Sequence, residues 1–375
     1  MMTTKHPNVK KLLDWFQTNQ RNLPWRKTKD IYHIWASEVM LQQTQVTTVI
    51  PYYKRFLERF PTVGRLARGS EQEVLKLWEG MGYYSRIRNF HRAARQVMTV
   101  YDGKIPDTPE TFQKLPGVGP YIAAAVLSIA LDIPLPAVDG NVMRVYTRFH
   151  GIADDIRKNT TRDRIFNELK GIIPTEPPGA AGDFTQAFME LGALICTPQK
   201  PRCDACPFHE QCIAFTTNTI DRYPFKSPAG KVPEYKVSIG IIIKEAKFYI
   251  QKRPSEGHLG GLWEFPGGKA AAGESPEQTL FRECKEELGC EVEILQPLPL
   301  VRHAYSHFKI QMSPFICQLK HGDIHPQENR PFRWITISEL DIYPFPGANH
   351  KFFPRLKEYF TDFFARNKNP GCFTV

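Results

Sequence analysis

The sequence lacks a hydrophobic run of the length that a signal peptide or a membrane-spanning helix requires. Its first residues, Met-Met-Thr-Thr-Lys-His-Pro, are mostly polar, and its most apolar stretch, residues 121–131, ends at Asp132. A membrane-spanning helix needs about 20 consecutive apolar residues, and a signal peptide needs an apolar core behind its charged start. We therefore expect a soluble protein of the cytoplasm that has no membrane partner.

Cysteine is also scarce, with eight residues in a chain of 375. A reducing compartment does not favour a disulfide framework. Four of the eight share one proline-rich loop at the spacing C-x6-C-x2-C-x5-C, namely Cys196, Cys203, Cys206 and Cys212. Four neighbouring thiolates suit a [4Fe–4S] cluster, and a tetrahedral zinc site takes the same ligands. Thiol chemistry alone leaves both metals open.

Acidic residues are outnumbered by basic ones. The 49 lysines and arginines exceed the 39 aspartates and glutamates, which gives a net charge of +10, and residues 51–100 alone hold ten basic and four acidic residues. Such an excess suits the phosphate backbone of DNA, although charge alone fits an ordinary solvated surface at least as well. The length and the 42% hydrophobic content predict two domains with a sizeable core.

Residues 114–121, Lys-Leu-Pro-Gly-Val-Gly-Pro-Tyr, predict a tight turn between two helices. Two glycines and two prolines within six residues cannot stay helical, whereas the Ala- and Leu-rich residues 121–131 can. Gly117 and Gly119 allow the backbone to approach a ligand, and the N-terminus of the following helix offers a phosphate site. A carboxylate, Asp139, follows, and DNA would repel it unless the chemistry requires it there.

A second helical stretch is expected over residues 31–60, and it carries Glu38 among apolar neighbours. Such surroundings raise the pKa of a carboxyl group, so Glu38 is a candidate general acid. The alternative is a glutamate on the wet face of a helix. The polar run Gln42-Gln-Thr-Gln45 interrupts the apolar pattern, and a flat amide there could fill the space that a flipped base leaves. A solvated helix face is the alternative.

Leu115-Pro-Gly-Val-Gly followed by Val138-Asp-Gly-Asn-Val resembles the helix-hairpin-helix superfamily of base-excision DNA glycosylases. Residues 35–45, Trp-Ala-Ser-Glu-Val-Met-Leu-Gln-Gln-Thr-Gln, resemble the MutY-type adenine DNA glycosylases closely. The resemblance implies that Glu38 protonates the leaving base and that Asp139 stabilises the cationic sugar. In the related endonuclease III enzymes a lysine occupies the position of Tyr121. Tyrosine cannot form a Schiff base, so the resemblance implies a glycosylase without strand cleavage.

The same resemblance assigns contacts with DNA. It implies that Trp25, Arg26 and Gln186 contact the extruded adenine. It further implies that Gln43 and Tyr83 wedge into the stack and that Thr44 lies near the lesion guanine. The spacing of the four cysteines matches the [4Fe–4S] loop of these enzymes. The remaining residues expected to bind adenine or DNA are Gly117, Gly119, Tyr121 and Asn141.

A second motif follows a linker at residues 213–233 and a hairpin expected over 235–252. Gly268-x5-Glu274-x7-Arg282-Glu283-x2-Glu286-Glu287-x-Gly289 matches the Nudix box at every fixed position. Three glutamates on one helix face suit Mg²⁺ and a diphosphate. MutY-type proteins usually carry a degraded box in a domain that reads 8-oxoguanine, and Tyr305-Ser306-His307 resembles their lesion-reading loop.

We thus predict an all-α glycosylase domain over residues 1–225, with its iron–sulfur loop at 196–212, and an α/β/α Nudix-like domain over 234–368. The expected reaction releases adenine that is mispaired with 8-oxoguanine or guanine in double-stranded DNA. The expected protein is a monomer associated with the nucleoid of a bacterial cytoplasm. The alternatives are a Nudix hydrolase of oxidised nucleoside triphosphates with a DNA-tethering domain, or both activities in one chain.

Overall fold

The computed structural model describes residues 6–228, 230, 232–305 and 307–367. The chain forms two compact units, of which unit 1 comprises residues 1–69 and 89–229, and unit 2 comprises residues 70–88 and 230–375. The sequence placed residues 70–88 in the helical domain, whereas their contacts group them with unit 2. Within the described residues, no helix combines the length and the apolar character that crossing a membrane would take.

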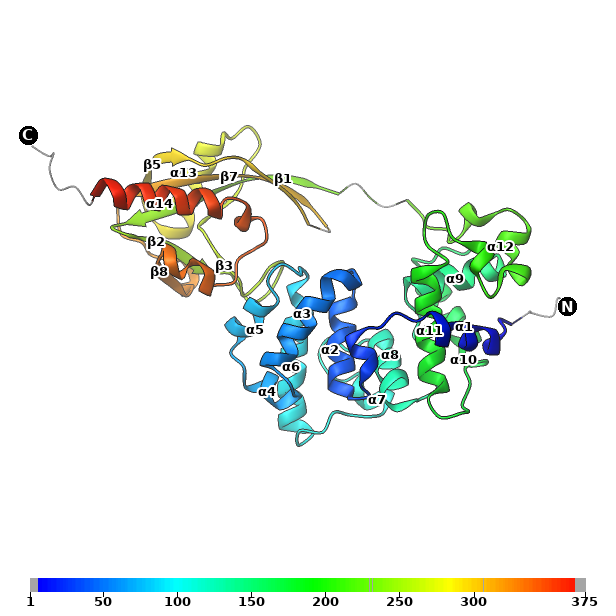
Figure 1. Cartoon of the computed structure of the whole chain (residues 1–375). Helices are drawn as coiled ribbons and strands as arrows, with labels where there is room; N and C mark the ends of the chain where they lie inside the picture. The colour runs from blue at the N-terminus through cyan, green and yellow to red at the C-terminus, as the bar shows by residue number, and fades with distance from the viewer. Residues whose placement is uncertain (1–5, 229, 231, 306, 368–375) are drawn as a thin grey trace, which may run out of the picture. The chain divides into compact units, whose positions relative to one another are not determined.

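Unit 1 is helical, and the carboxyl-terminal part of α6 also belongs to it (Figure 1). Its elements in chain order are α1 (Val9–Asn19), η1 (Pro24–Lys27), α2 (Ile31–Leu41), α3 (Val46–Arg59), α4 (Val63–Arg68), α6 (Tyr84–Val100), α7 (Pro109–Phe112), α8 (Pro120–Leu131), α9 (Gly140–His150), α10 (Asn159–Lys170), α11 (Ala180–Leu194), η2 (Cys203–Ala205), η3 (His209–Gln211), α12 (Ile213–Thr216) and η4 (Ile220–Arg222).

Helix α8 is the central helix of unit 1, because it packs against both α2 and α11. Residues 122–129 are buried without interruption, as expected for a helix that is apolar on every side. Helix α11 in turn packs against α1 and α9. Successive helix pairs therefore connect α2, α8, α11 and α9 through direct packing.

The predicted helix, turn and helix are present around residues 114–121. Helix α7 ends at Phe112, and α8 begins at Pro120, a residue that fits the first helical turn because it needs no N–H there. Gly117 has φ +78°, and a Cβ on it would lie 2.7 Å from the Cβ of Asn89. The turn therefore requires glycine at this position for both its backbone angle and its packing.

The prediction of one helical stretch over residues 31–60 is wrong in the middle of that range. The structure has two helices there, α2 and α3, and the polar run Gln42–Gln45 separates them. Gln43 has φ +55°, a left-handed conformation that is costly for a residue other than glycine and is often retained at functional sites. The polar run is thus a corner rather than a helix face.

Unit 2 is built around one sheet, in the order β3-β2-β1-β7-β5. The expected hairpin over 235–252 is confirmed, since β1 pairs with β2 antiparallel, and β1 pairs with β7 in parallel. The elements are α5 (Glu71–Leu77), the start of α6, β1 (Glu234–Lys244), β2 (Lys247–Lys252), β3 (Trp263–Glu264), β4 (Gly267–Lys269), α13 (Pro276–Leu288), β5 (Glu291–Pro297), β6 (Val301–Ala304), β7 (Lys309–His321), η5 (Gln327–Asn329), β8 (Phe332–Thr336), η6 (Ile337–Ile342), η7 (Asn349–Lys351) and α14 (Phe353–Asn367).

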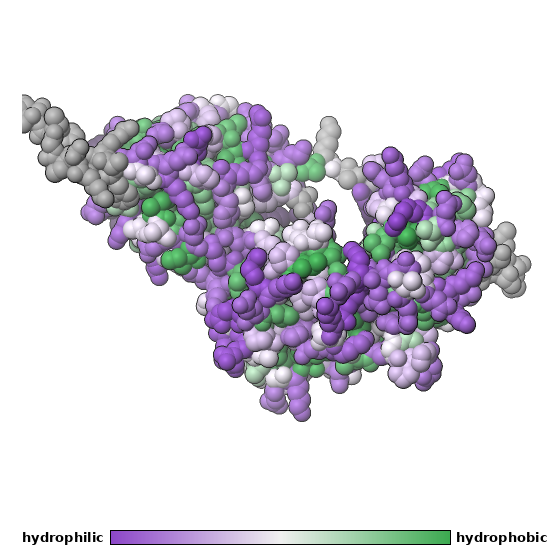
Figure 2. All heavy atoms as spheres, viewed as in Figure 1, coloured by the Kyte–Doolittle hydropathy of each residue, from purple (hydrophilic) through white to green (hydrophobic). Residues whose placement is uncertain are grey.

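Two separate hydrophobic cores flank this sheet. Leu280, Cys284 and Leu288 of α13 pack with Ile242 of β1. On the other face, α14 packs with Ile241 and Ile243 of the same strand, because successive strand residues point to opposite faces. The predicted α/β/α sandwich is therefore confirmed. On the face of the molecule shown in Figure 2, hydrophilic side chains cover most of each unit.

Candidate functional site

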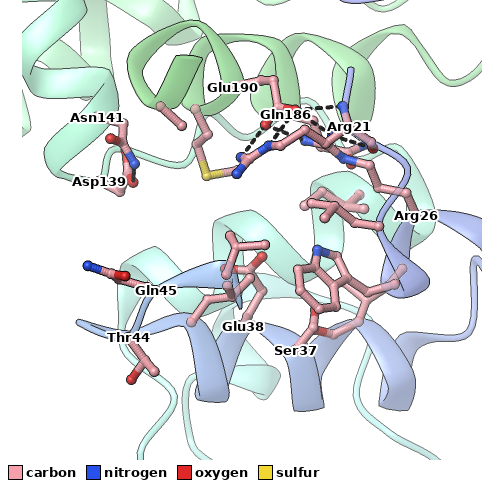
Figure 3. Close-up of a pocket in the computed structure, with 18 of the residues that line it drawn as sticks. Arg21, Arg26, Ser37, Glu38, Thr44, Gln45, Asp139, Asn141, Gln186 and Glu190 are labelled. Carbon is pink, nitrogen blue, oxygen red and sulfur yellow. Dashed lines mark hydrogen bonds and ion pairs between the residues drawn. The ribbon is translucent and has the colours of Figure 1, made fainter. Parts of the chain in front are cut away.

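Unit 1 contains a cavity of about 620 Å³ between η1, α2, α8, α11 and the start of α9. Figure 3 shows polar and charged side chains that converge on it from both sides. The cavity brings together nine of the residues that the sequence singled out, although Arg26 and Gln186, for example, are 160 positions apart in the chain. They are Trp25, Arg26, Glu38, Gln43, Thr44, Tyr121, Asp139, Asn141 and Gln186.

Glu38 lies on α2 and is only 4% exposed. Burial raises the pKa of this carboxyl group to about 7, although a hydrogen bond from the Tyr121 hydroxyl to Glu38 Oε2 at 2.9 Å opposes that rise. The charge of nearby Asp139 raises the pKa further. A carboxylic acid with such a pKa carries a proton for much of the time near neutral pH, as a general acid requires.

Asp139 is the N-cap of α9, and helix geometry fixes its carboxylate. Its Oδ1 accepts from the backbone N–H of Val142 at 2.8 Å, and its Oδ2 accepts from Asn141 Nδ2 at 2.7 Å. Burial raises the pKa of Asp139, while these donors favour the charged form and oppose the rise. Arg144 donates to Asn141 Oδ1 at 2.8 Å, so the amide of Asn141 must turn its NH₂ group toward Asp139.

The sequence missed Glu190, which organises the opposite wall. Its side chain is 1% exposed and forms ion pairs with Arg21 and Arg26. Burial alone would raise the pKa of Glu190, but hydrogen bonds from the two arginines overcome it and bring the pKa down to about 2. Glu190 stands four residues after Gln186 on α11, and this helical spacing puts both on one face. That spacing was the available signal.

This arginine network also orients Gln186 (Figure 3). Arg26 donates two hydrogen bonds to Glu190, and its Nε donates a third to Gln186 Oε1 at 3.1 Å. Since the carbonyl oxygen of Gln186 accepts from Arg26, the NH₂ group of this amide is the end available to a ligand.

The cysteine loop packs on the hydrophobic core of unit 1 through Cys196, Cys206 and Cys212. Burial raises the pKa of the Cys206 thiol to about 12, and the neighbouring thiols of the loop contribute to that rise. The buried Arg148 donates to Cys196 Sγ at 3.4 Å. The donor set fits a metal cluster in its chemistry. Across the described residues, however, no three such side chains already form a ligand set.

The glutamates of the box lie on α13, and arginines hold them. Arg282 donates to Glu283 and Glu286 at 2.9 Å each. Glu287 accepts from the backbone N–H of Gly267 at 3.1 Å and from Arg330 at 3.2 Å. The three glutamates therefore lie on one helix, but their present partners are cations and amides of the chain itself, and among the described residues no three such side chains form a ligand set for a metal ion.

A second cavity, of about 590 Å³, lies in unit 2 and is lined by Glu287, Tyr305 and His307. The box and the predicted lesion-reading loop thus face the same space, whereas Ser306 lies outside the described residues. The ring of Tyr83, another left-handed residue with φ +49°, is 6.2 Å from that of His307. Sequence reasoning missed Glu264 in this cavity, where burial raises its pKa to about 7 despite the charge of Arg253.

Two family models match the chain. The HhH-GPD superfamily of base excision DNA repair proteins matches residues 36–173. A NUDIX domain matches residues 238–355. The first match includes Glu38, Tyr121 and Asp139, and the second includes the sheet and the box.

Curated relatives align over most of the chain. The adenine DNA glycosylase of Buchnera aphidicola subsp. Acyrthosiphon pisum is 31% identical over 95% of this chain and 99% of its own length. The proteins of the same name from Rattus norvegicus and Homo sapiens are 33% and 32% identical, over 93% and 91% of this chain and 77% and 72% of theirs. The structure of a thermostable thymine-DNA glycosylase is 27% identical with a TM-score of 0.51, and covers 56% of this chain and 95% of that one. The chain belongs to the adenine DNA glycosylase family, which combines a helix-hairpin-helix glycosylase domain with a Nudix-like domain.

Proposed function

We propose that this chain hydrolyses the N-glycosidic bond of adenine that is mispaired with 8-oxoguanine or guanine in duplex DNA. The family supports adenine as the leaving base. One observation carries the proposal: a carboxyl group with a raised pKa, Glu38, and a helix-capping carboxylate, Asp139, line the same cavity. Two carboxyl groups in different environments suit cleavage of a glycosidic bond.

Adenine enters the cavity after rotating out of the duplex. The NH₂ group of Gln186 donates to a ring nitrogen of the base, since Arg26 occupies the carbonyl oxygen of this amide. Trp25, which is mostly buried, contributes an apolar wall. Gln43, at the corner between α2 and α3, enters the space in the stack that the base leaves, and the adjacent Thr44 lies near the lesion guanine.

Glu38 then gives its proton to the departing base, and the base leaves as a neutral molecule. The hydroxyl of Tyr121 already donates to Glu38 Oε2, so it stabilises the carboxylate that forms. The negative charge of Asp139 stabilises the cationic sugar, and the donors Asn141 and Val142 N–H hold the carboxylate in place. Water then adds to C1′ of the cationic sugar, and the proton that it loses restores the acid form of Glu38.

The product retains an intact strand. Tyr121 stands where a lyase would need an amine nucleophile, and among the described residues that line the cavity there is no lysine. The turn that contains Gly117 and Gly119 holds a DNA phosphate at the N-terminus of α8. The helical domain predicted over residues 1–225 carries out this chemistry. The domain predicted over residues 234–368 recognises the opposing 8-oxoguanine through Tyr305, Ser306 and His307. Tyr83 lies beside the damaged base.

Substitution of the two carboxyl groups tests the proposal. Glu38→Gln should lower the single-turnover rate of adenine release from an A:8-oxoguanine duplex by about 10²- to 10⁴-fold, because an amide cannot deliver the proton. Asp139→Asn should lower it by about 10²- to 10³-fold, because a neutral amide cannot stabilise the cationic sugar. Release is measured as alkali-dependent nicks on the adenine strand. Both variants should still bind the duplex, and near-parental rates in either one would contradict the assignment.

We further propose that Cys196, Cys203, Cys206 and Cys212 hold a [4Fe–4S] cluster. The cluster would supply a structural cross-link within the loop, and the guanidinium of Arg148 would balance negative charge on the sulfur of Cys196. The same loop is tied to the site, since Arg144 donates both to Cys196 O at 2.7 Å and to Asn141. The role of the cluster is therefore in ordering residues around the cavity.

Protein prepared without oxygen should contain roughly four iron and four sulfide per chain. Cys203→Ala should lower the iron content and the yield of folded protein. Cys317→Ala, which removes a free thiol of unit 2, is the matched control and should leave the iron content unchanged. One zinc per chain with no iron would refute the cluster.

The intact box favours a second candidate function, hydrolysis of an oxidised nucleoside triphosphate with Mg²⁺ at Glu283, Glu286 and Glu287. The observation in its favour is that Glu287 and Tyr305 line one cavity. Arg330, which lies outside the box, acts against it, because its guanidinium pairs with the carboxylate of Glu287 that a cation would need. We therefore place lesion reading first.

The double variant Glu286→Gln with Glu287→Gln separates the two functions. It should release adenine at nearly the parental rate. These carboxylates would repel DNA phosphates if they lay at the DNA interface, so we expect them to lie away from it. The parental chain with 8-oxo-dGTP and Mg²⁺ should release no pyrophosphate. Pyrophosphate release that disappears in the double variant would show that the chain has two activities.

A further inference from the structure

Residues 254–261, which we call the His258 loop, connect β2 to β3 in a conformation that backbone sterics disfavour. Gly257, Leu259 and Gly261 all have positive φ, at +84°, +59° and +77°. Glycine adopts such angles freely, but leucine does so at a cost. A Cβ on Gly260 would lie 2.6 Å from the carbonyl oxygen of Ser255, so the loop also folds tightly against itself.

The pairing of β2 with β3 does not require this strain. Gln251 and Glu264 pair directly across the two strands, and many relaxed loops could join them. Hydrogen bonds instead hold the loop in place, from Gly261 N to Pro254 O at 3.2 Å and from Arg88 to Ser255 O. A strained backbone that the surrounding structure enforces is typical of a functional site.

The loop carries His258 at its tip, and the ring of His258 lies against the predicted lesion-reading loop. Its centroid is 5.9 Å from that of His307 and 5.5 Å from that of Phe308. Phe308 in turn lies 4.8 Å from Tyr305. All four side chains line the cavity of unit 2, so two imidazoles stand beside two aromatic faces.

This set of groups suits the edge of an oxidised purine. Guanine offers two acceptors, N7 and O6, along its major-groove edge, whereas 8-oxoguanine carries a donor N7–H and an additional acceptor, O8. A neutral imidazole donates at one ring nitrogen and accepts at the other. Two imidazoles can therefore provide a donor for O8 and an acceptor for N7–H, while the aromatic rings of Phe308 and Tyr305 stack on the base.

We propose that His258 is a specificity-determining residue that contacts the oxidised edge of the purine together with His307. The inference rests on the proposed function, in which unit 2 reads the lesion opposite adenine. The strained loop keeps the imidazole in position before the lesion arrives. Recognition thus draws on the segment between β2 and β3 as well as on Tyr305 and His307.

The test compares His258→Ala with the full-length parent for adenine release from A:8-oxoguanine and A:G duplexes under single turnover. The preference for A:8-oxoguanine should fall about tenfold, which corresponds to about 1.4 kcal/mol, while the rate on A:G stays at the parental value. His258→Asn keeps a donor and an acceptor and should restore part of the preference. The exposed His321, at the end of β7, provides the matched control, because His321→Ala should change neither rate.

An unchanged preference in His258→Ala would overturn the inference. If the parent itself showed no preference for A:8-oxoguanine, lesion reading by unit 2 would fail first, and the two failures are thus distinguishable. A second arm measures binding of free 8-oxo-dGTP to the same proteins. Loss of nucleotide binding in His258→Ala with an intact preference among duplexes would assign the residue to a nucleotide site and contradict its role on DNA.

Discussion

Burial of two carboxyl groups in one cavity is the constraint on which the rest of unit 1 depends. Glu38 is almost fully buried and Asp139 partly buried, and burial raises the pKa of each. Removal from solvent is costly for a charged group unless donors replace the water. The chain provides different donors for the two, a single hydroxyl from Tyr121 for Glu38 and the amide of Asn141 with a helix N-terminus for Asp139. The asymmetry suits one group to hold a proton and the other to carry a charge.

The helices around α8 keep these donors in position. Tyr121 lies in the first turn of α8, directly after a turn that requires glycine at position 117. Asp139 caps the next helix, α9. Across the cavity, Glu190 fixes Arg26, and Arg26 fixes the amide of Gln186. Each of these side chains therefore already has a hydrogen-bond partner within the chain, which is the condition for a preorganised site.

The sequence predicted the features that lie within short segments. The glycine turn, the cysteine loop and the box each occupy fewer than about 25 consecutive residues, so their residue types and spacing can be recognised locally, although the four cysteines by themselves left iron–sulfur and zinc open. Glu38 could be singled out because its neighbours are apolar. The two-domain organisation and the α/β/α sheet followed from the change of pattern beyond residue 233, and the family resemblance supplied the roles.

Interactions between distant segments were beyond the sequence. Arg21 and Glu190 are 169 positions apart, and neither segment by itself predicts that the two side chains pair. The corner at Gln43 was interpreted as helix, because no residue type in this segment indicates a left-handed backbone conformation. The pairing of Arg330 with Glu287 is equally non-local. It gives a carboxylate of the Nudix box a partner within the chain, although the motif is intact in sequence. The strained loop that carries His258 likewise depends on contacts rather than on pattern.

The pH dependence of the single-turnover rate on an A:8-oxoguanine duplex tests the central claim most directly. Because Glu38 must hold a proton to act and its pKa is raised to about 7, the rate should be highest below this value and should fall as the pH rises through it. Glu38→Gln should remove this dependence from the residual rate. A parental rate that stays constant from about pH 6 to about pH 9, a range that includes the pKa of Glu38, would contradict the assignment of Glu38 as the general acid.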